Sequence, residues 1–441
     1  MKEMQQDTRL TLISRIPVMI LGFISMTILT RWLGPEGNGI YTFLFANINL
    51  LLLLFGLQSE PAIIHYLSKP GSDQSRVMSM AWFTLAMSFL VFAAVILITG
   101  YALPGISHFI LPPSQPLPFF LWFIVWCFLF RKMQNVTLAI LRGTLQFKLH
   151  TRLQLWSQLI PILLYAIGFL VLMKTRTAGD AVPVFRIILL AHASVAVVGF
   201  GMVLSKIPFQ FSMPLRSGLT HFLSYSVKSM LDALGKFINR RVDVYFVEAF
   251  KGTTALGQYG LASQINNFTQ EAILPITQVM NPYLVKSDQA GRAEIICRMS
   301  RIVFTATCIL ALLIVLCAPW AIPLVFGKSF SNAIVATQLL SLSVIFISMR
   351  PVFANYFQSI NQLRYNIQSN WLGVLLTILL DFLLIPTWGI EGAAVASVIA
   401  YISSAAYLAM HFMLKTQTGM IPLIRLTKSD VDWLLHLKEK P

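Results

Sequence analysis

Residues 78–100 read MSMAWFTLAMSFLVFAAVILITG, an apolar stretch of the chain with no charged side chain. A helix needs about 20 mostly apolar residues to cross a hydrocarbon core of roughly 30 Å. Backbone amides and carbonyls in lipid must form hydrogen bonds within their own segment, so a helix is the expected conformation at this length. The stretch therefore predicts a transmembrane helix.

The composition of the whole chain also indicates a membrane protein. Of 441 residues, 56% are hydrophobic and only 11% are charged, whereas a soluble domain carries about 25% charged residues. The balance is basic, with 33 Lys and Arg against 17 Asp and Glu. No segment is long and polar enough to present a folded basic surface to nucleic acid, so we attribute the excess to positively charged cytoplasmic loops.

Hydrophobic patterning predicts about twelve spans joined by short connections. They cover approximately residues 11–31, 40–67, 77–100, 117–141, 152–174, 185–205, 219–246, 254–284, 299–321, 332–359, 366–387 and 390–414. Basic residues gather in alternate connections, which places both termini in the cytoplasm by the positive-inside rule. The expected fold is an all-α, multi-pass integral membrane protein.

The sequence repeats itself weakly in its two halves. The first predicted span is followed by Arg31–Tyr41, RWLGPEGNGIY, and the seventh by Phe250–Tyr259, FKGTTALGQY. Both stretches end in Gly-x-Tyr, and the two motifs are offset by about 218 residues, close to half of the chain. We therefore predict two six-helix lobes in parallel orientation, residues 1–210 and 211–415, followed by a cytoplasmic tail over 416–441.

The seventh predicted span carries charges along one face. Its charged residues recur every four positions, at Lys228, Asp232, Lys236 and Arg240, so they share one side of a helix. Each charge at the bilayer centre costs about 2.5–3.5 kcal/mol, so the face must lie against protein or a water-filled cavity. A self-neutralising ladder that only locks the helices together is one interpretation. Its excess positive charge, and the small net stabilisation from buried ion pairs, favour a functional cavity.

Cationic residues in several spans predict a cavity for an anionic substrate, because guanidinium and ammonium groups bind phosphate oxygens. The candidate substrate-binding residues are Arg15, Lys228, Lys236, Arg240 and Arg350. Three acidic residues are candidates to carry a coupled proton or cation: Glu60, Asp232 and Glu271. The many Asn and Gln residues of the second, eighth and tenth spans are interpreted as hydrogen bonds between helices.

No catalytic, metal-binding or cofactor motif stands out in the sequence. Residues 326–329, FGKS, resemble the end of a P-loop, but Ile322 occupies the position of the required first glycine. We therefore do not expect ATP hydrolysis, and we expect neither enzymatic activity nor a bound metal or cofactor. Asp430 and Asp432 lie beside Lys428 and predict a solvated charge cluster in the tail.

Four stretches of the chain resemble a known family of transporters. The most specific is Asp381–Ser397, DFLLIPTWGIEGAAVAS, and the others are Arg31–Tyr41, Leu141–Phe147 and Asp243–Tyr259. They are similar to the polysaccharide-biosynthesis flippases of the multidrug/oligosaccharidyl-lipid/polysaccharide exporter superfamily. One departure is Asp381, where such proteins usually carry Asn, and we carry no role over to it.

The resemblance implies a V-shaped transporter with twelve helices in two six-helix lobes. It also implies a substrate, a polyprenyl-pyrophosphate-linked oligosaccharide, which moves from the cytoplasmic to the periplasmic leaflet of a bacterial inner membrane. Such a flippase serves the biosynthesis of a surface polysaccharide, such as the O-antigen of lipopolysaccharide, a capsule or an exopolysaccharide. A polysaccharide polymerase and a chain-length regulator are then the expected partners, besides membrane lipids.

Two other functions stay open. A drug or small-cation exporter of the same superfamily should have a cavity dominated by acidic and aromatic residues, whereas the charges within the predicted spans are mostly basic. An integral-membrane glycosyltransferase or polysaccharide polymerase usually has a large extracytoplasmic loop with acidic or arginine motifs. The longest predicted outer connection, around residues 101–117, is short and has no Lys, Arg, Asp or Glu.

Overall fold

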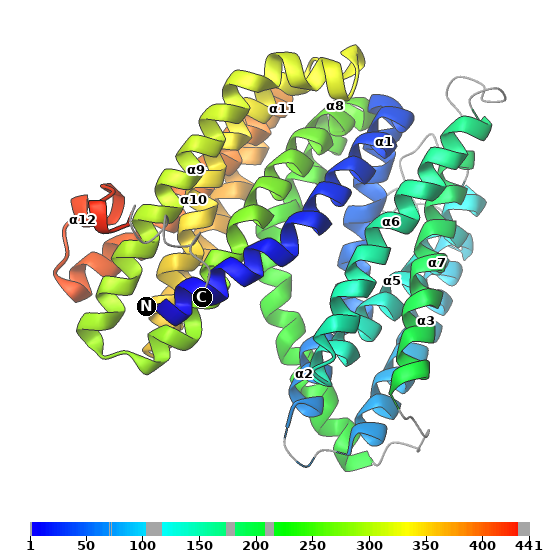
Figure 1. The fold of residues 1–441 in the computed structure, drawn as a ribbon. Helices are drawn as coiled ribbons and strands as arrows, with labels where there is room; N and C mark the ends of the chain where they lie inside the picture. Colours follow the sequence, from blue (N-terminus) through cyan, green and yellow to red (C-terminus); the bar gives the residue numbers. More distant parts are fainter. Residues whose placement is uncertain are drawn as a thin grey trace. The chain divides into compact units, whose positions relative to one another are not determined.

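The computed structural model describes residues 2–69, 71, 73–102, 117–172, 181–207 and 216–430, and within these ranges it contains helices and no strand (Figure 1). In chain order the helices are α1 (Lys2–Phe55), α2 (Glu60–Leu67), α3 (Gln74–Ala102), α5 (Leu117–Gly143), α6 (Phe147–Leu172), α7 (Val182–Lys206), α8 (Arg216–Lys286), α9 (Gln289–Val325), the 3-10 helix η1 (Lys328–Phe330), α10 (Ala333–Ser359), α11 (Arg364–Thr416) and α12 (Ile421–Ile424). The predicted all-α fold is confirmed.

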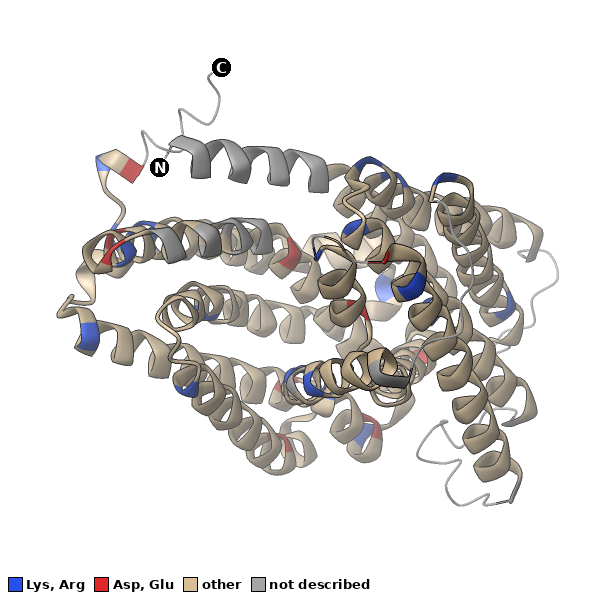
Figure 2. Cartoon of the chain, turned by 90° about the horizontal axis from the view of Figure 1, so that it is seen from below, with Lys and Arg blue, Asp and Glu red and all other residues tan. Residues whose placement is uncertain are grey.

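Among the described residues, 8 helices are long and apolar enough to cross a membrane. Two of them, α1 and α11, contain 54 and 53 residues, which at 1.5 Å per residue is about 80 Å of helix, more than twice the hydrocarbon thickness. Helix α8 is longer still, with 71 residues, but its many charged and amide side chains lower its hydropathy. Elsewhere charged residues are sparse along the helices (Figure 2).

Each of the three long helices is interrupted at one glycine. Gly34 and Gly252 share nearly the same conformation, with φ of 70° and 79° and ψ of 179° and 176°, and Gly389 has a φ of 64°. Such positive φ values favour glycine because it has no Cβ. Helix α11 folds back at its break, since Ser369 Oγ donates to the Ser404 carbonyl oxygen at 2.8 Å. In a straight helix these two residues would be about 50 Å apart.

The second predicted span is not continuous. Leu57 and Gln58 have positive φ values of 53° and 44°, and the chain starts a new helix at Glu60. The uninterrupted span predicted over residues 40–67 is therefore wrong at this corner. Gly56, Ser59 and Pro61 are local signals for a break here, and the Lys132 ammonium from α5 stabilises the corner.

The chain forms two compact units, each described here by itself. The carboxy-terminal unit contains residues 1–23, 34–39 and 239–441, and the amino-terminal unit contains residues 24–33 and 40–238. In the carboxy-terminal unit, α10 packs against α9 and α11, and α12 packs against α9. In the amino-terminal unit, α5 packs against α2, α3 and α7. The lobe boundaries predicted from the sequence stay a prediction.

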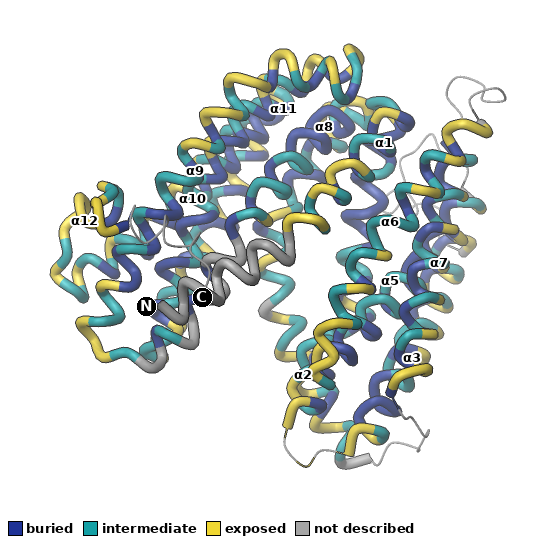
Figure 3. Tube along the Cα trace, viewed as in Figure 1, coloured by how far each residue is buried: buried dark blue, intermediate teal, exposed yellow. Residues whose placement is uncertain are grey.

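Apolar side chains fill the interior of each unit. In the amino-terminal unit, Phe185 packs edge-to-face with Phe120 and Phe123, at ring-centroid distances of 5.1 and 5.3 Å. In the carboxy-terminal unit, the rings of Tyr356 and Phe412 meet at 4.9 Å in the same geometry, which aromatic pairs prefer. Other apolar residues lie on exposed helix faces (Figure 3), as expected for surfaces that contact lipid.

The two copies of the repeated motif meet within the carboxy-terminal unit. Asn38 Nδ2 donates to the Gly257 carbonyl oxygen at 2.7 Å. A Cβ on Gly39 would lie 1.9 Å from the Thr253 carbonyl oxygen. A Cβ on Gly257 would lie 1.7 Å from the Pro35 carbonyl oxygen. The 218-residue offset of the repeat relates Gly39 to Gly257 and Pro35 to Thr253. The two glycine–carbonyl contacts are therefore equivalent, as contacts across a two-fold axis are. Only glycine at both positions permits this backbone-to-backbone approach.

The segment after α11 is attached to α9 through Asp430. Arg301 Nε and Nη2 donate to the two Asp430 carboxylate oxygens at 2.6 and 2.9 Å, and the Thr427 hydroxyl donates at 2.6 Å. Although burial opposes ionisation, the hydrogen bonds from Arg301 and Thr427 lower the pKa of Asp430 from 3.8 to about 2. The predicted solvated cluster is therefore wrong for Asp430, which is fully buried. Asp432 lies outside the described residues.

Candidate functional site

The predicted site residues are distributed over both units. In the carboxy-terminal unit lie Arg240, Glu271 and Arg350, and in the amino-terminal unit lie Glu60, Lys228 and Lys236. The side chains of Arg15 and Asp232 lie outside the part of the structure that is described. Lys228 and Lys236 are exposed on α8, and Glu271 is exposed further along the same helix.

Arg240 lies at the wall of a small pocket in the carboxy-terminal unit. The pocket has a volume of about 50 Å³ and is lined by Arg240, Gln270, Ile273, Thr277, Ile347, Ser348 and Pro351. Arg240 Nη2 donates to Gln270 Oε1 at 2.7 Å, which is possible because α8 folds back at Gly252. Among the described residues, the hydrogen-bond partner of Arg240 is thus a neutral amide and not a carboxylate.

Arg350 is held by a polar network between α10 and α11. Its Nη2 lies 3.3 Å from Asn370 Oδ1, and its Nε lies 3.4 Å from Ser369 Oγ. Asn370 Oδ1 also accepts a hydrogen bond of 3.3 Å from Asn239, the neighbour of Arg240. Asn370 therefore links the helix that carries Arg350 to the helix that carries Arg240.

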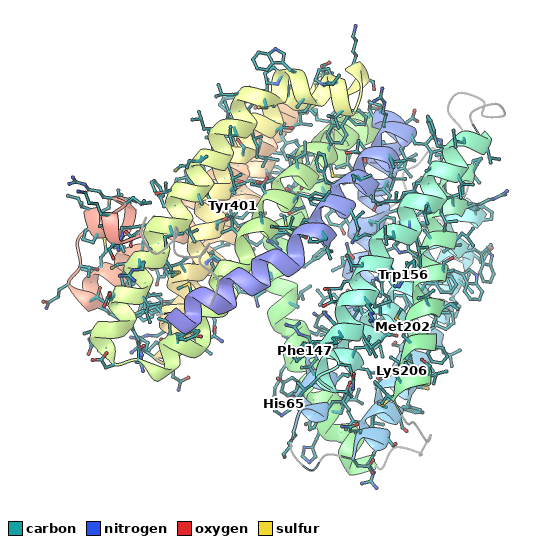
Figure 4. The ribbon with its side chains drawn as sticks, viewed as in Figure 1. His65, Phe147, Trp156, Met202, Lys206 and Tyr401 are labelled. Carbon is teal, nitrogen blue, oxygen red and sulfur yellow. The ribbon has the colours of Figure 1, made fainter. Side chains whose placement is uncertain are left out.

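Tyr401 on α11 (labelled in Figure 4) experiences the charges of several of these residues. Arg240, Arg241 and Arg350 all lie close enough for their positive charges to act on the Tyr401 hydroxyl group, and Asp243 does so as well. The structure thus brings together two of the predicted cations, Arg240 and Arg350, and adds Arg241. We call Arg240, Arg241, Arg350 and Tyr401 the arginine cluster.

The arginine cluster has the chemistry of a site for phosphate groups. A guanidinium group presents several N–H donors in one plane and matches two phosphate oxygens at once. Replacing a neutral amide partner by a phosphate exchanges a hydrogen bond worth about 0.5–1.5 kcal/mol for a charge-assisted one worth about 1.5–3 kcal/mol. Arg240, which donates to Gln270, is therefore suited to change partner when an anion arrives.

Two buried carboxyl groups lie beside the cluster. Asp381 is fully buried, and neither of its oxygens has a hydrogen-bond partner among the described residues. Asp243 lies close enough for its charge to act on Asp381, and it accepts hydrogen bonds from the Tyr259 hydroxyl and from the Val244 amide. An unpartnered buried carboxylate is costly, so Asp381 needs a proton or a cation for stability.

Glu60 has a different environment in the amino-terminal unit. Lys132 is 1% exposed, and its ammonium group donates three hydrogen bonds of 2.9 Å, to Gly56 O, Ser59 Oγ and Glu60 Oε1. These bonds use all three ammonium protons. Within the described ranges, Glu60 Oε2 has no hydrogen-bond partner. Glu60 is thus the counter-ion of a lysine that stabilises the corner between α1 and α2.

Sequence patterns did not reveal the acidic pair or the lysine corner. Asp243 and Asp381 are 138 positions apart in the sequence, and Lys132 lies 72 positions after Glu60. One signal was available for Asp381. It is the single charged residue in the apolar stretch WLGVLLTILLDFLLIP, residues 371–386, and a charge in such a stretch indicates a functional site. The pairing itself depends on packing between helices and has no local sequence signal.

Similarity to known proteins covers much of the chain. Residues 5–288 match the family described as "Polysaccharide biosynthesis protein". A relative from Haloferax volcanii, named "Probable low-salt glycan biosynthesis flippase Agl15", is 23% identical over 237 residues, which are 51% of this chain and 49% of the relative. The chain spans about half the length of the curated relatives that it matches.

Solved structures share the fold of the whole chain. The lipid II flippase MurJ in an inward closed conformation has a TM-score of 0.74 at 15% identity, over 97% of this chain and 91% of MurJ. An inward-facing multidrug resistance transporter of the MATE family in the MOP superfamily has a TM-score of 0.72 at 16% identity, over 93% of this chain and 98% of that one. At these identities the likeness concerns the fold, which is that of a multi-pass membrane transporter.

Proposed function

Because the chain belongs to the polysaccharide biosynthesis protein family, we propose that it is a flippase for a polyprenyl-pyrophosphate-linked oligosaccharide. It turns this lipid from the cytoplasmic to the periplasmic leaflet of a bacterial inner membrane, with both termini in the cytoplasm. The transported unit serves a surface polysaccharide such as O-antigen, capsule or exopolysaccharide. A polymerase and a chain-length regulator act on the same pathway and are the proposed partners.

The observation that carries this proposal is the arginine cluster. Asn370 bonds both Arg350 and Asn239, the chain neighbour of Arg240, and the charges of Arg240, Arg241 and Arg350 all act on the Tyr401 hydroxyl group within one helical unit. Permanent positive charges are costly in such a place unless an anion or a water-filled cavity compensates them. The pyrophosphate of the proposed substrate is an anion of matching chemistry. Arg15, Lys228 and Lys236 are proposed as further cations that the substrate meets.

We propose that Asp381, with Asp243, carries the coupled ion. The chain has no P-loop, so ATP hydrolysis by this chain does not drive transport. The two buried carboxyl groups, one without any partner, favour uptake of a proton or a monovalent cation when the unit opens to water. Glu60, Asp232 and Glu271 stay candidates for coupling, although Glu60 already neutralises Lys132.

The flippase function is tested in a strain that lacks this gene and in strains that carry plasmid copies. Polyprenyl-linked oligosaccharides are measured by mass spectrometry, and surface polysaccharide is measured beside them. We expect lipid-linked units to accumulate and surface polymer to disappear in the deletion strain. The variants Arg240→Gln and Arg350→Gln should reproduce this block. Arg425→Gln, which removes an exposed positive charge from the tail, is the matched control and should restore the polymer.

A second candidate function is ion-coupled export of a small molecule. The acidic pair of Asp243 and Asp381 favours it, because buried carboxyl groups also suit a cationic drug. If lipid-linked units and surface polymer are both unchanged in the deletion strain, and sensitivity to cationic drugs rises, the exporter replaces the flippase. A deletion strain with unchanged polymer and unchanged drug sensitivity contradicts both functions.

A further inference from the structure

A second pocket lies in the carboxy-terminal unit and shares no lining residue with the pocket beside Arg240. It has a volume of about 270 Å³ and is lined by Gln289, Arg292, Tyr356, Ile360, Gln362 and Lys415. This volume is close to the lower end of small-molecule sites, about 300 Å³. The lining comes from the first turn of α9, the last turn of α10 with the connection after it, and the last turn of α11, so several helix ends meet around it.

Two cations contribute to the wall of this pocket. Arg292 Nε donates to the Leu284 carbonyl oxygen at 2.9 Å, which fixes the side chain while leaving the terminal nitrogens of the guanidinium group for other partners. Its charge also acts on the hydroxyl group of Tyr356, another lining residue. Arg292 is therefore oriented by the backbone and directed at the pocket.

Lys415 is held in the pocket wall by neutral groups. Its Nζ donates to Gln362 Oε1 and lies 5.4 Å from the centre of the Tyr365 ring. Arg364 lies over the same ring at 4.9 Å, so a third cation is close by. These cation–π contacts hold the charges without neutralising them.

Among the residues that the structure describes, no acidic side chain lines this pocket. The six lining residues include two cations and no carboxylate. The nearby Asp288 caps α9, accepting a hydrogen bond of 2.9 Å from the Gly291 amide. The two amides, Gln289 and Gln362, can complete the donor set around an anion. The wall thus has a net positive charge and several directed donors.

We propose that this pocket binds the phosphate group of a ligand at the cytoplasmic surface of the membrane. The connections between α8 and α9 and between α10 and α11 belong to the side predicted to be cytoplasmic by its basic residues. A phosphate at this depth comes from a phospholipid headgroup, from a polyprenyl phosphate or from free phosphate in solution. The proposal concerns a site other than the arginine cluster and holds whether or not the chain is a flippase.

The test measures binding to the purified full-length chain in neutral detergent. Three probes are compared by native mass spectrometry and by thermophoresis: inorganic phosphate, short-chain phosphatidylglycerol and farnesyl phosphate. The variants are Arg292→Gln and Lys415→Gln, and Lys428→Gln is the matched control, because it removes an exposed charge from the same side of the chain. We expect each pocket variant to weaken binding about 10-fold or more, the loss of one charge-assisted hydrogen bond, with no change in the control.

The preferred probe identifies the source of the phosphate. Phosphatidylglycerol binding most tightly indicates a headgroup, farnesyl phosphate indicates a polyprenyl lipid, and equal affinity for all three indicates that recognition ends at the phosphate. Wild-type affinity in both pocket variants overturns the proposal, and so does the absence of binding of every probe to the wild-type chain. If the variants do not fold, the wild-type chain is labelled with an amine-reactive reagent. Protection of Lys415 by the best-binding probe is expected, and equal labelling with and without it refutes the site.

Discussion

The most direct perturbation of the repeat junction is the substitution Gly257→Ala. The added Cβ would lie 1.7 Å from the Pro35 carbonyl oxygen, whereas real Cβ contacts are almost never shorter than 3.0 Å. The two backbones must therefore separate by more than 1 Å. Such a movement also stretches the buried hydrogen bond from Asn38 to Gly257, which measures 2.7 Å.

The expected loss of stability follows from these two effects. Forced separation of a packed contact costs about 1–3 kcal/mol, and the weakened hydrogen bond costs about 0.5–1.5 kcal/mol. Together they destabilise the carboxy-terminal unit by about 1.5–4.5 kcal/mol. The measurement is thermal unfolding of the purified protein in detergent, where we expect a melting temperature several degrees lower than that of the wild type.

A matched control exists in α7. A Cβ on Gly201 would meet no atom within 4 Å, so Gly201→Ala should leave stability unchanged or raise it by about 0.5–1 kcal/mol through helix propensity. Gly39→Ala should resemble Gly257→Ala, because its Cβ would approach the Thr253 carbonyl oxygen at 1.9 Å. The double variant should lose less than the sum of the two, since one separation relieves both contacts. If Gly257→Ala is as stable as Gly201→Ala, the junction is not close-packed and the reasoning fails.

Three further predictions follow from the buried charges. Lys132→Met leaves the partly exposed Glu60 without its counter-ion and should lower the unfolding free energy by about 1–3 kcal/mol, while addition of Glu60→Gln should restore part of the loss. Additive losses in thermal unfolding would contradict the pairing. Asp381→Asn should abolish ion-dependent transport in proteoliposomes without lowering thermal stability, because the carboxylate has no partner to lose, and full transport would exclude Asp381 as the coupling group. Asp430→Asn should release the tail from Arg301, at a cost of about 1–3 kcal/mol, and speed proteolysis of the tail. In the wild type the pKa of Asp430 is lowered from 3.8 to about 2. The attachment of the tail should therefore persist above pH 4 and weaken as the pH falls toward 2. A rate of tail cleavage that does not change with pH in this range would refute the role of the Asp430 charge.

Patterns along the chain predicted the fold better than the site. The apolar stretches and the three glycine positions mark the helices and their breaks, because transmembrane length and positive φ are local properties. The repeated Gly-x-Tyr motif even indicated which two segments are equivalent, and these segments pack against each other at Gly39 and Gly257. The corner at Gly56–Ser59 was missed because the apolar length was given more weight than the break signals of Gly56, Ser59 and Pro61, and its stabilising cation lies 76 residues from Gly56.

The candidate site stays a prediction, and sequence reasoning found its members only where a charge within an apolar span is costly. Arg240 and Arg350 were recognised because guanidinium groups within apolar spans need an explanation, and both belong to the arginine cluster. Helical spacing placed Lys228, Lys236 and Arg240 on the same face, and all three are exposed, but Lys228 and Lys236 belong to the other unit. Periodicity shows which residues share a face of one helix, and it does not show what packs against that face. Asp381 was noticed as a departure from the family, yet its lack of partners is visible only in three dimensions.

The reciprocal glycine contact also constrains how the chain matures on the ribosome. Gly39 emerges early, but its partner segment around Thr253 is translated more than 200 residues later. At about 5–20 residues per second, the first segment waits roughly 10–40 s for the second. During that interval the backbone of Pro35–Gly39 lacks its contact with the segment around Thr253 and Gly257. The first half of the chain must therefore insert into the membrane before this contact can form. Completion of this junction is therefore a late event in biogenesis.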